Sequence, residues 1–177
     1  KKNLWLLITL SFYVLNLVVL SNLTISLSMN YRENLKNGKY KIAVWGTGYI
    51  GLSTMAFFSK KRVKCVGFDI DKSKVDTINS GKLPIKELKD WFGFDIKNSV
   101  KNKYLQATND YKTFYDNSFN VHFIAIPTEK NGKPFFDILF NVLKKIVKIT
   151  KIKNNIKPII IIESTLTPQC SEKKIIP

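Results

Sequence analysis

Short apolar and β-branched runs, each bounded by turn-forming residues, predict buried strands at residues 41–45, 63–69, 121–127 and 158–164. A shorter strand is predicted at residues 104–108. The main runs are continuously apolar and do not alternate with polar residues. This pattern favours a parallel sheet that is covered on both faces.

Helical spacing of apolar residues lies between these runs, at residues 49–61, 72–82 and 136–150. Gly81 is expected to stop the second helix, and Asp137 to cap the start of the third. Alternating strands and helices predict an α/β fold, with a Rossmann-like, doubly wound, mainly parallel sheet and right-handed crossovers.

The front of the chain has a different pattern, because residues 3–31 carry no charged side chain and residues 4–20 are almost wholly apolar. We expect an apolar helix here, and residues 4–28 are long enough to cross a bilayer. The basic residues that follow would place the downstream part in the cytoplasm. The alternative is that residues 1–28 are mistranslated upstream sequence or the tail of a fusion, because the chain begins with Lys and Met29 stands shortly before the first strand.

We therefore expect three parts: an apolar segment at 1–30, a linker at 31–40 and one folded domain at 41–177. An apolar content of 45% and an aromatic content of 12% support a folded core. The two cysteines, Cys65 and Cys170, form no CxxC pair and no cluster with His122, so the sequence predicts neither a metal site nor a disulfide framework. All three side chains are expected to be structural.

The net charge of +16 has two explanations. A basic surface can attract nucleic acid, acidic lipid or anionic substrates. The lysines are scattered among many Asn, Ile, Phe and Tyr residues, however, which is typical of a compositional bias. No nucleic-acid-binding motif accompanies the charge, so we expect no nucleic-acid partner.

The strongest candidate for chemistry is the loop from Gly46 to Gly51, with the pattern GxGxxG between a strand and a helix. Gly46 would permit the tight turn, Gly48 would leave room for a pyrophosphate, and Gly51 would let the helix approach the strand. The phosphates of a dinucleotide would lie at the N-terminus of the helix.

An acidic residue at the end of the next strand completes this pattern. Asp69 ends the run at 63–69, and its carboxylate can accept hydrogen bonds from the hydroxyls of the adenosine ribose. It would also repel a 2′-phosphate, which favours NAD over NADP. Asp71 is the nearby alternative, but Asp69 lies at the strand end itself.

Five segments in this order, KIAVWGTGYIGLS, GFDIDKSKVDTINSGKLPI, QATND, FIAIPTE and IIESTLTP, give residues 41–177 a resemblance to a known family. The chain resembles the N-terminal NAD-binding domain of the nucleotide-sugar dehydrogenases: the UDP-glucose, UDP-N-acetylmannosamine and GDP-mannose 6-dehydrogenases. The resemblance implies NAD as cofactor, a UDP-sugar as substrate of the full-length enzyme, oxidation of a sugar C6 alcohol to a uronate for polysaccharide precursors, and a homodimer. We expect a cytoplasmic location, either free or anchored to the cytoplasmic side of a membrane through residues 4–28.

The resemblance also implies roles for particular residues. Glu163 and Thr128 match positions that could assist catalysis, and Glu172 matches an acidic residue that follows. The matches to cofactor-binding positions are Gly46, Gly48, Tyr49, Ile50, Gly51, Asp69, Lys74, Thr108, Pro127, Thr128, Ser164 and Thr165.

The family's nucleophilic cysteine belongs to a GGSC-like motif, and residues 1–177 contain no such motif. We therefore expect these residues alone to bind NAD without turnover. The segment TPQCSE departs from the Pro-Gly that is usual in the family. The resemblance therefore does not predict the conformation of the turn after the last strand. An alternative function is a membrane-tethered, non-catalytic NAD-binding sensor or partner subunit.

Overall fold

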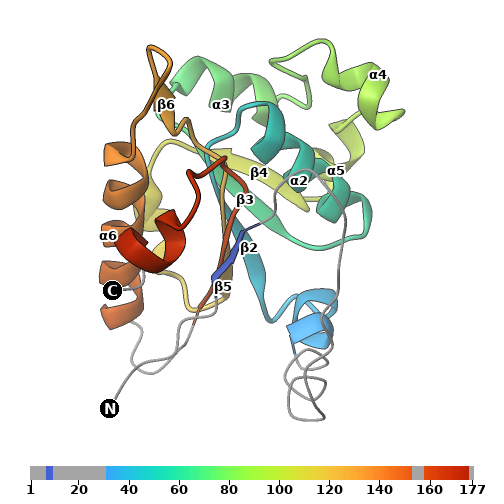
Figure 1. The fold of residues 1–177 in the computed structure, drawn as a ribbon. Helices are drawn as coiled ribbons and strands as arrows, with labels where there is room; N and C mark the ends of the chain where they lie inside the picture. The colour runs from blue at the N-terminus through green and yellow to red at the C-terminus, as the bar shows by residue number, and fades with distance from the viewer. Residues whose placement is uncertain (1–6, 10–30, 153–157, 176–177) are drawn as a thin grey trace.

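The computed structural model describes residues 7–9, 31–152 and 158–175 (Figure 1). Its main sheet has six strands in the order β1-β8-β5-β2-β3-β4, and every neighbouring pair is parallel. The strands are β1 (Leu7–Thr9), β2 (Lys41–Trp45), β3 (Cys65–Phe68), β4 (Leu105–Thr108), β5 (Phe119–Ile124) and β8 (Ile159–Ile162).

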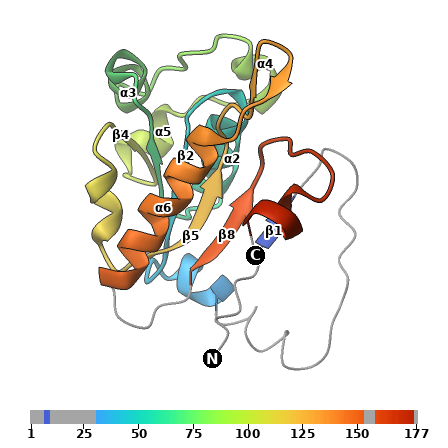
Figure 2. The same cartoon turned by 60° about the vertical axis from the view of Figure 1, so that its left-hand side comes forward.

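Helices cover both faces of this sheet, which makes it doubly wound (Figures 1 and 2). One face carries α2 (Tyr49–Lys60), α3 (Lys72–Asn79), α4 (Leu88–Phe92) and α5 (Lys97–Lys101). The other carries α6 (Asp137–Ile152), the 3-10 helix η1 (Tyr111–Tyr115) and the π-helical turn η2 (Ser171–Ile175). A separate antiparallel hairpin joins β6 (Glu129–Lys130) to β7 (Lys133–Pro134).

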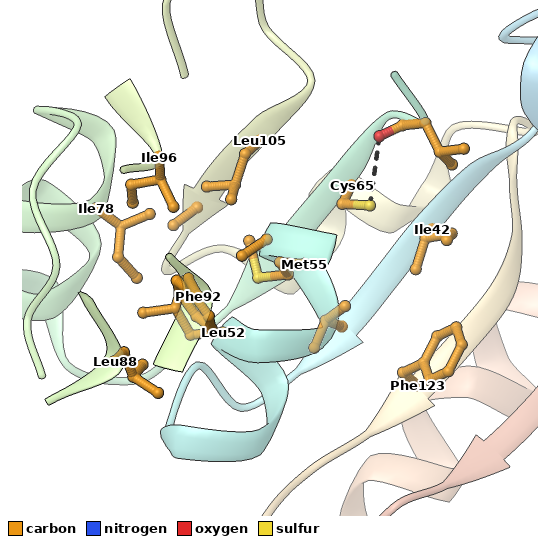
Figure 3. Packing of buried hydrophobic residues seen from close by; sticks show 14 of the residues in the cluster. Ile42, Leu52, Met55, Cys65, Ile78, Leu88, Phe92, Ile96, Leu105 and Phe123 are labelled. Carbon is orange, nitrogen blue, oxygen red and sulfur yellow. Dashed lines mark hydrogen bonds between the residues drawn. The ribbon is translucent and has the colours of Figure 1, made fainter. Parts of the chain in front are cut away.

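The central strand β2 shows how the sequence builds two cores. Successive side chains of a strand point to opposite faces. Ile42 and Val44 therefore pack toward α2, in the first core. Ala43 and Trp45 pack toward α6, in the second core. Figure 3 shows the first of these cores, in which Leu52 and Met55 of α2 lie among the apolar side chains of the sheet and of α4. Burial on both faces explains why the strands read as continuous apolar runs.

The α/β prediction is confirmed, and most boundaries agree within a few residues. The 121–127 strand is displaced, because β5 begins at Phe119 and ends at Ile124. Asp137 is the first residue of α6 and not the residue before it. Residues 31–36, expected to be linker, are helical, and Tyr31 and Leu35 pack against the first core.

The apolar helix expected at residues 4–20 is wrong at Leu7–Thr9, which form β1 instead. This strand pairs in parallel with β8, where Leu7 lies opposite Ile160 and Thr9 opposite Ile162. The rest of the predicted segment lies outside the described residues. Among the residues that the structure describes, no helix has the length and apolar character needed to cross a membrane.

Candidate dinucleotide-binding site

The candidate site lies at the carboxyl edge of the sheet, where the strand order changes direction between β2 and β5. In an open, doubly wound sheet, ligands bind in the crevice outside the carboxyl ends of the strands at this switch point. The glycine loop follows β2 and Asp69 follows β3. The segments 125–128 and 163–165 follow β5 and β8, so the topology brings all four predicted segments to one edge.

Two of the three glycines are required by close backbone packing. Gly46 has a φ of 92°, and a Cβ there would overlap the carbonyl oxygen of Ala125. A Cβ at Gly51 would overlap the carbonyl oxygen of Gly46 and would lie 3.1 Å from Val44 Cγ1. These two glycines bring the loop and α2 against β2 and the end of β5.

Gly48 differs, because a Cβ there would meet no described atom within 4 Å. No packing of the described residues requires this glycine. Gly48 is also the N-cap of α2, and within the described residues it provides no side-chain cap for the first N–H groups of the helix. Such N–H groups, together with the helix dipole, favour an anion. Open space at a glycine beside a helix N-terminus fits a pyrophosphate.

Asp69 lies directly beneath this loop, 8% exposed. Its Oδ2 accepts hydrogen bonds from the backbone N–H of Thr47 at 2.9 Å and from the hydroxyl of Thr47 at 2.7 Å. Its Oδ1 accepts from the N–H of Asp71 at 3.0 Å. Burial raises the pKa of Asp69, but these hydrogen bonds and the charge of Lys74 outweigh burial and hold the pKa below its ordinary value. The group is therefore an anion at neutral pH.

Lys74 and Asp71 take separate places around this carboxylate. The ammonium of Lys74 lies 3.3 Å from Asp69 Oδ2. The Asp71 side chain instead accepts from the backbone N–H of Lys74 at 3.2 Å and caps α3. Asp69 therefore lies between the loop and Lys74, while the side chain of the alternative, Asp71, has a helix-capping contact.

The segments after β5 and β8 are joined by hydroxyl groups. Ser164 Oγ accepts from the N–H of Ile126 at 2.9 Å and donates to the carbonyl of Ile126 at 2.6 Å. Thr128 Oγ1 donates to the carbonyl of Thr165 at 2.6 Å. The two predicted segments therefore form one bonded unit beside the glycine loop.

Thr108 and Glu163 have contacts within the protein. The Thr108 hydroxyl accepts from the N–H of Asp110 at 3.1 Å, a local turn after β4. The Glu163 carboxylate accepts from the hydroxyl of Thr54 on α2, at 2.8 Å to Oε1 and 2.9 Å to Oε2. Burial raises the pKa of Glu163, and the bond from Thr54 offsets this only in part. Glu172 is an exposed residue of η2.

Sequence reasoning missed three contacts at this site. Thr47 and Thr54 orient Asp69 and Glu163, but no motif specifies a hydroxyl at either position. The half-exposed ring of Trp91 on α4 stacks on Tyr49, with ring centroids 4.9 Å apart. His122 is buried within β5 and accepts from Trp45 Nε1 at 3.2 Å, as expected of a structural residue.

Within the part of the chain that the structure describes, no group of three or more His, Cys, Asp or Glu side chains could hold a metal ion. The glycine loop, the free N-terminus of α2 and the anionic Asp69 instead have the geometry of a dinucleotide-binding Rossmann domain. Residues 40–177 match the model of the UDP-glucose/GDP-mannose dehydrogenase family, NAD binding domain. The chain belongs to this family, and its cofactor is NAD.

Known relatives agree with this assignment. The chain is 37% identical over 130 residues to a UDP-N-acetyl-D-mannosamine dehydrogenase of Campylobacter jejuni, an alignment covering 71% of this chain and 29% of the relative. It is 39% identical over 132 residues to a UDP-glucose 6-dehydrogenase of Campylobacter jejuni subsp. jejuni, and this alignment covers 71% of this chain and 30% of the relative. The fold matches a crystal structure of GDP-mannose dehydrogenase from Pseudomonas aeruginosa with a TM-score of 0.63 and 25% identity. This match covers 77% of this chain and 31% of the GDP-mannose dehydrogenase chain. The chain thus spans about three tenths of the length of these relatives.

Proposed function

We propose that this chain is the cofactor-binding part of a nucleotide-sugar 6-dehydrogenase that oxidises the C6 alcohol of a UDP-sugar to a uronate for polysaccharide precursors. The observation that carries the proposal is the Asp69 carboxylate, held beneath a glycine loop whose Gly48 position is open. NAD supplies the hydride acceptor for such an oxidation. The identity to relatives named as UDP-sugar dehydrogenases supports the substrate class.

In this proposal, each predicted residue has a part in holding NAD. The backbone of Gly46, Gly48, Tyr49, Ile50 and Gly51 would bind the pyrophosphate. Asp69 and Lys74 would hold the adenosine ribose, and Thr108 would lie close to the cofactor. The residues after β5 and β8, which are Pro127, Thr128, Ser164 and Thr165, would border the nicotinamide, where Glu163 and Thr128 could assist the reaction.

Residues 1–177 alone should bind NAD without oxidising a sugar. The thiols of this sequence are Cys65 and Cys170, and both are buried. Burial also raises the pKa of Cys65, which disfavours the nucleophilic thiolate. We place the protein in the cytoplasm and expect a homodimer for the full-length enzyme. The alternative of a membrane-tethered sensor depends on residues 4–28, most of which lie outside the described residues.

Calorimetric titration of NAD into the 177-residue chain tests the cofactor site. Asp69→Ala should lower NAD affinity at least tenfold, because the ribose hydroxyls lose a charged acceptor. Asp71→Ala is the matched control, since its side chain caps α3, and should change affinity much less. Equal affinity of wild type and Asp69→Ala would refute the ribose assignment.

A second measurement tests whether residues 1–177 bind NAD without catalysing the oxidation. The purified chain, mixed with NAD and either UDP-glucose or UDP-N-acetylmannosamine, should produce no NADH above the rate without enzyme. Measurable turnover by the 177-residue chain would show that these residues contain a complete catalytic site.

A further inference from the structure

Thr47 occupies a variable position of the glycine pattern, yet it is completely buried, at 0% exposure. Its backbone N–H and its hydroxyl both donate to one oxygen of Asp69, at 2.9 and 2.7 Å. The loop is also fixed to the end of β3 by a bond from Gly46 N–H to the carbonyl of Phe68 at 2.8 Å. A single residue therefore connects the loop that would hold the pyrophosphate to the carboxylate that would hold the ribose.

The two oxygens of Asp69 differ in their partners. Oδ2 receives three donors, which are the two from Thr47 and the ammonium of Lys74 at 3.3 Å. Within the described residues, Oδ1 receives one, the N–H of Asp71. An ionised carboxylate has about four lone-pair sites shared between its oxygens. The protein's own donors thus concentrate on Oδ2, which leaves Oδ1 the better acceptor for a hydroxyl of a ligand.

Packing fixes the side chain of Thr47 in this orientation. A Cβ placed at Gly67 of β3 would lie 2.5 Å from Thr47 Cγ2 and 2.5 Å from Met55 Sδ, so the Thr47 methyl lies close against the backbone of β3. A β-branched side chain has few χ1 choices. With the methyl group directed at Gly67, the hydroxyl is directed at Asp69.

We propose that Thr47 is a positioning residue that turns Oδ1 of Asp69 toward the adenosine ribose and so sets the preference for NAD over NADP. This inference rests on the proposed function, because it requires NAD to bind at the glycine loop. Without the hydroxyl, Oδ2 keeps only two donors and the carboxylate can rotate toward Lys74. The ribose hydroxyls of NAD then meet a poorly oriented acceptor, whereas NADP, whose 2′-phosphate is repelled by Asp69, loses little.

Two variants separate the hydroxyl from the methyl group. Thr47→Val keeps the shape and removes the donor, and it should weaken NAD binding about tenfold, the usual size of a lost bond to a charged group. NADP binding should change less than threefold, so the preference for NAD falls. Thr47→Ser keeps the donor and removes the methyl group. Because the charged acceptor Asp69 still favours the same hydroxyl orientation, its NAD affinity should stay within about threefold of wild type.

The decisive measurement repeats the Val substitution in an Asp69→Ala background. If Thr47 acts through Asp69, Thr47→Val should have almost no effect there. The same loss in both backgrounds, or a loss as large in Thr47→Ser as in Thr47→Val, would overturn the inference in favour of a packing role. Wild-type NAD affinity in Thr47→Val would also overturn it.

These outcomes are distinct from a failure of the proposed function, in which the wild-type chain itself would bind no NAD in the same titration. Circular dichroism reports whether each variant folds. If Thr47→Val does not fold, Thr47→Ala replaces it, because Ala removes the same donor without any added bulk. Thr47→Ala is then compared with Thr47→Ser, and the same results would support or overturn the inference.

Discussion

The carboxylate of Glu163, directly after β8, accepts a hydrogen bond from the hydroxyl of Thr54 in the middle of α2, at 2.8 Å to Oε1 and 2.9 Å to Oε2. This contact joins α2, the helix after the glycine loop, to the end of β8. In the sheet, β8 is two strands away from β2, the strand that precedes α2. Burial of the carboxylate is only partly compensated, so the pKa of Glu163 is raised above its ordinary 4.5. Burial of this carboxylate therefore makes the stability of the fold depend on pH, and the hydrogen bond from Thr54 reduces that dependence.

The sign of this dependence follows from the direction of the shift. Because the folded state holds the Glu163 proton more tightly than the unfolded chain, stability falls as pH rises from the ordinary value through the raised one. Glu163→Gln removes the charge but keeps an acceptor for Thr54. We expect it to raise the free energy of unfolding at pH 7, with the gain disappearing below about pH 4, where the carboxyl is protonated in both states.

Urea denaturation of wild type and Glu163→Gln at both pH values measures this difference. Glu172→Gln is the control, because Glu172 is exposed on η2 and its neutralisation should leave stability nearly unchanged. A loss of stability in Glu163→Gln at pH 7 would contradict the expected sign.

The two glycines at the start of α2 should respond differently to alanine. Gly51→Ala places a methyl group against the carbonyl oxygen of Gly46, so the loop must move and the domain should lose about 2–4 kcal/mol of stability together with its NAD affinity. Gly48→Ala meets no described atom within 4 Å, so thermal unfolding should change little while NAD affinity falls at least tenfold. Normal NAD binding by Gly48→Ala would mean that the pyrophosphate does not approach this position.

Trp45 gives a prediction about the second core. Its ring is completely buried and its Nε1 donates to His122 Nδ1 at 3.2 Å. Trp45→Phe removes this donor and leaves a void, which should cost about 2–4 kcal/mol. Trp91→Phe, at a half-exposed site, should cost less than about 1 kcal/mol. Guanidinium denaturation of both variants and of wild type measures these two costs. Similar costs for the two variants would show that neither the buried hydrogen bond nor the packing of the Trp45 ring contributes much to stability.

The pairing of β1 with β8 can be tested by shortening the chain. A chain that begins at Met29 lacks Leu7–Thr9 and leaves one edge of β8, a strand of four isoleucines, without its partner. Exposed apolar edge strands pair with other chains. We expect the shortened protein to unfold at a lower temperature and to self-associate in size-exclusion chromatography. An unchanged melting temperature and a monodisperse peak would show that this pairing does not stabilise the domain.

The parts of the fold that the sequence predicted are those with strong local signals. The strand at 41–45 agrees with β2 at both ends, and the helix at 49–61 differs from α2 by one residue. Both have dense apolar patterns, and the two glycines that close packing requires are Gly46, directly after the strand, and Gly51, within the helix. The boundary of β5 was harder to predict because the pairing register with β2 shifts between Lys41 and Ile42, and an irregularity of this kind has no signature in a run of apolar residues.

Short elements were missed for other reasons. The hairpin β6–β7 turns at Asn131 and Gly132, both with positive φ, and Asn-Gly is a strong signal for such a turn. Its strands are only two residues long and exposed, so no apolar pattern marked them. The five-residue helix α4 contributes Leu88 and Phe92 to the first core, but it is too short for a periodicity to be recognised.

At the site, the motif predicted which residues meet but not what holds them. Asp69 was identified from its place at a strand end, which is a property of the fold. Its contact with Thr47 depends on a side chain at a position where the motif allows any residue. The bond between Thr54 and Glu163 joins residues far apart in the sequence, and one sequence does not show such pairs.

Because Trp91 stacks on Tyr49, we expect the fluorescence of this domain to respond to its own ligand. Tyr49 is the first residue of α2, beside the space where the pyrophosphate is expected, and the half-exposed Trp91 ring lies against it. Trp45, by contrast, is sealed within the second core. Quenching of tryptophan emission on addition of NAD, and its absence in Trp91→Phe, would give a label-free signal for following cofactor exchange in real time.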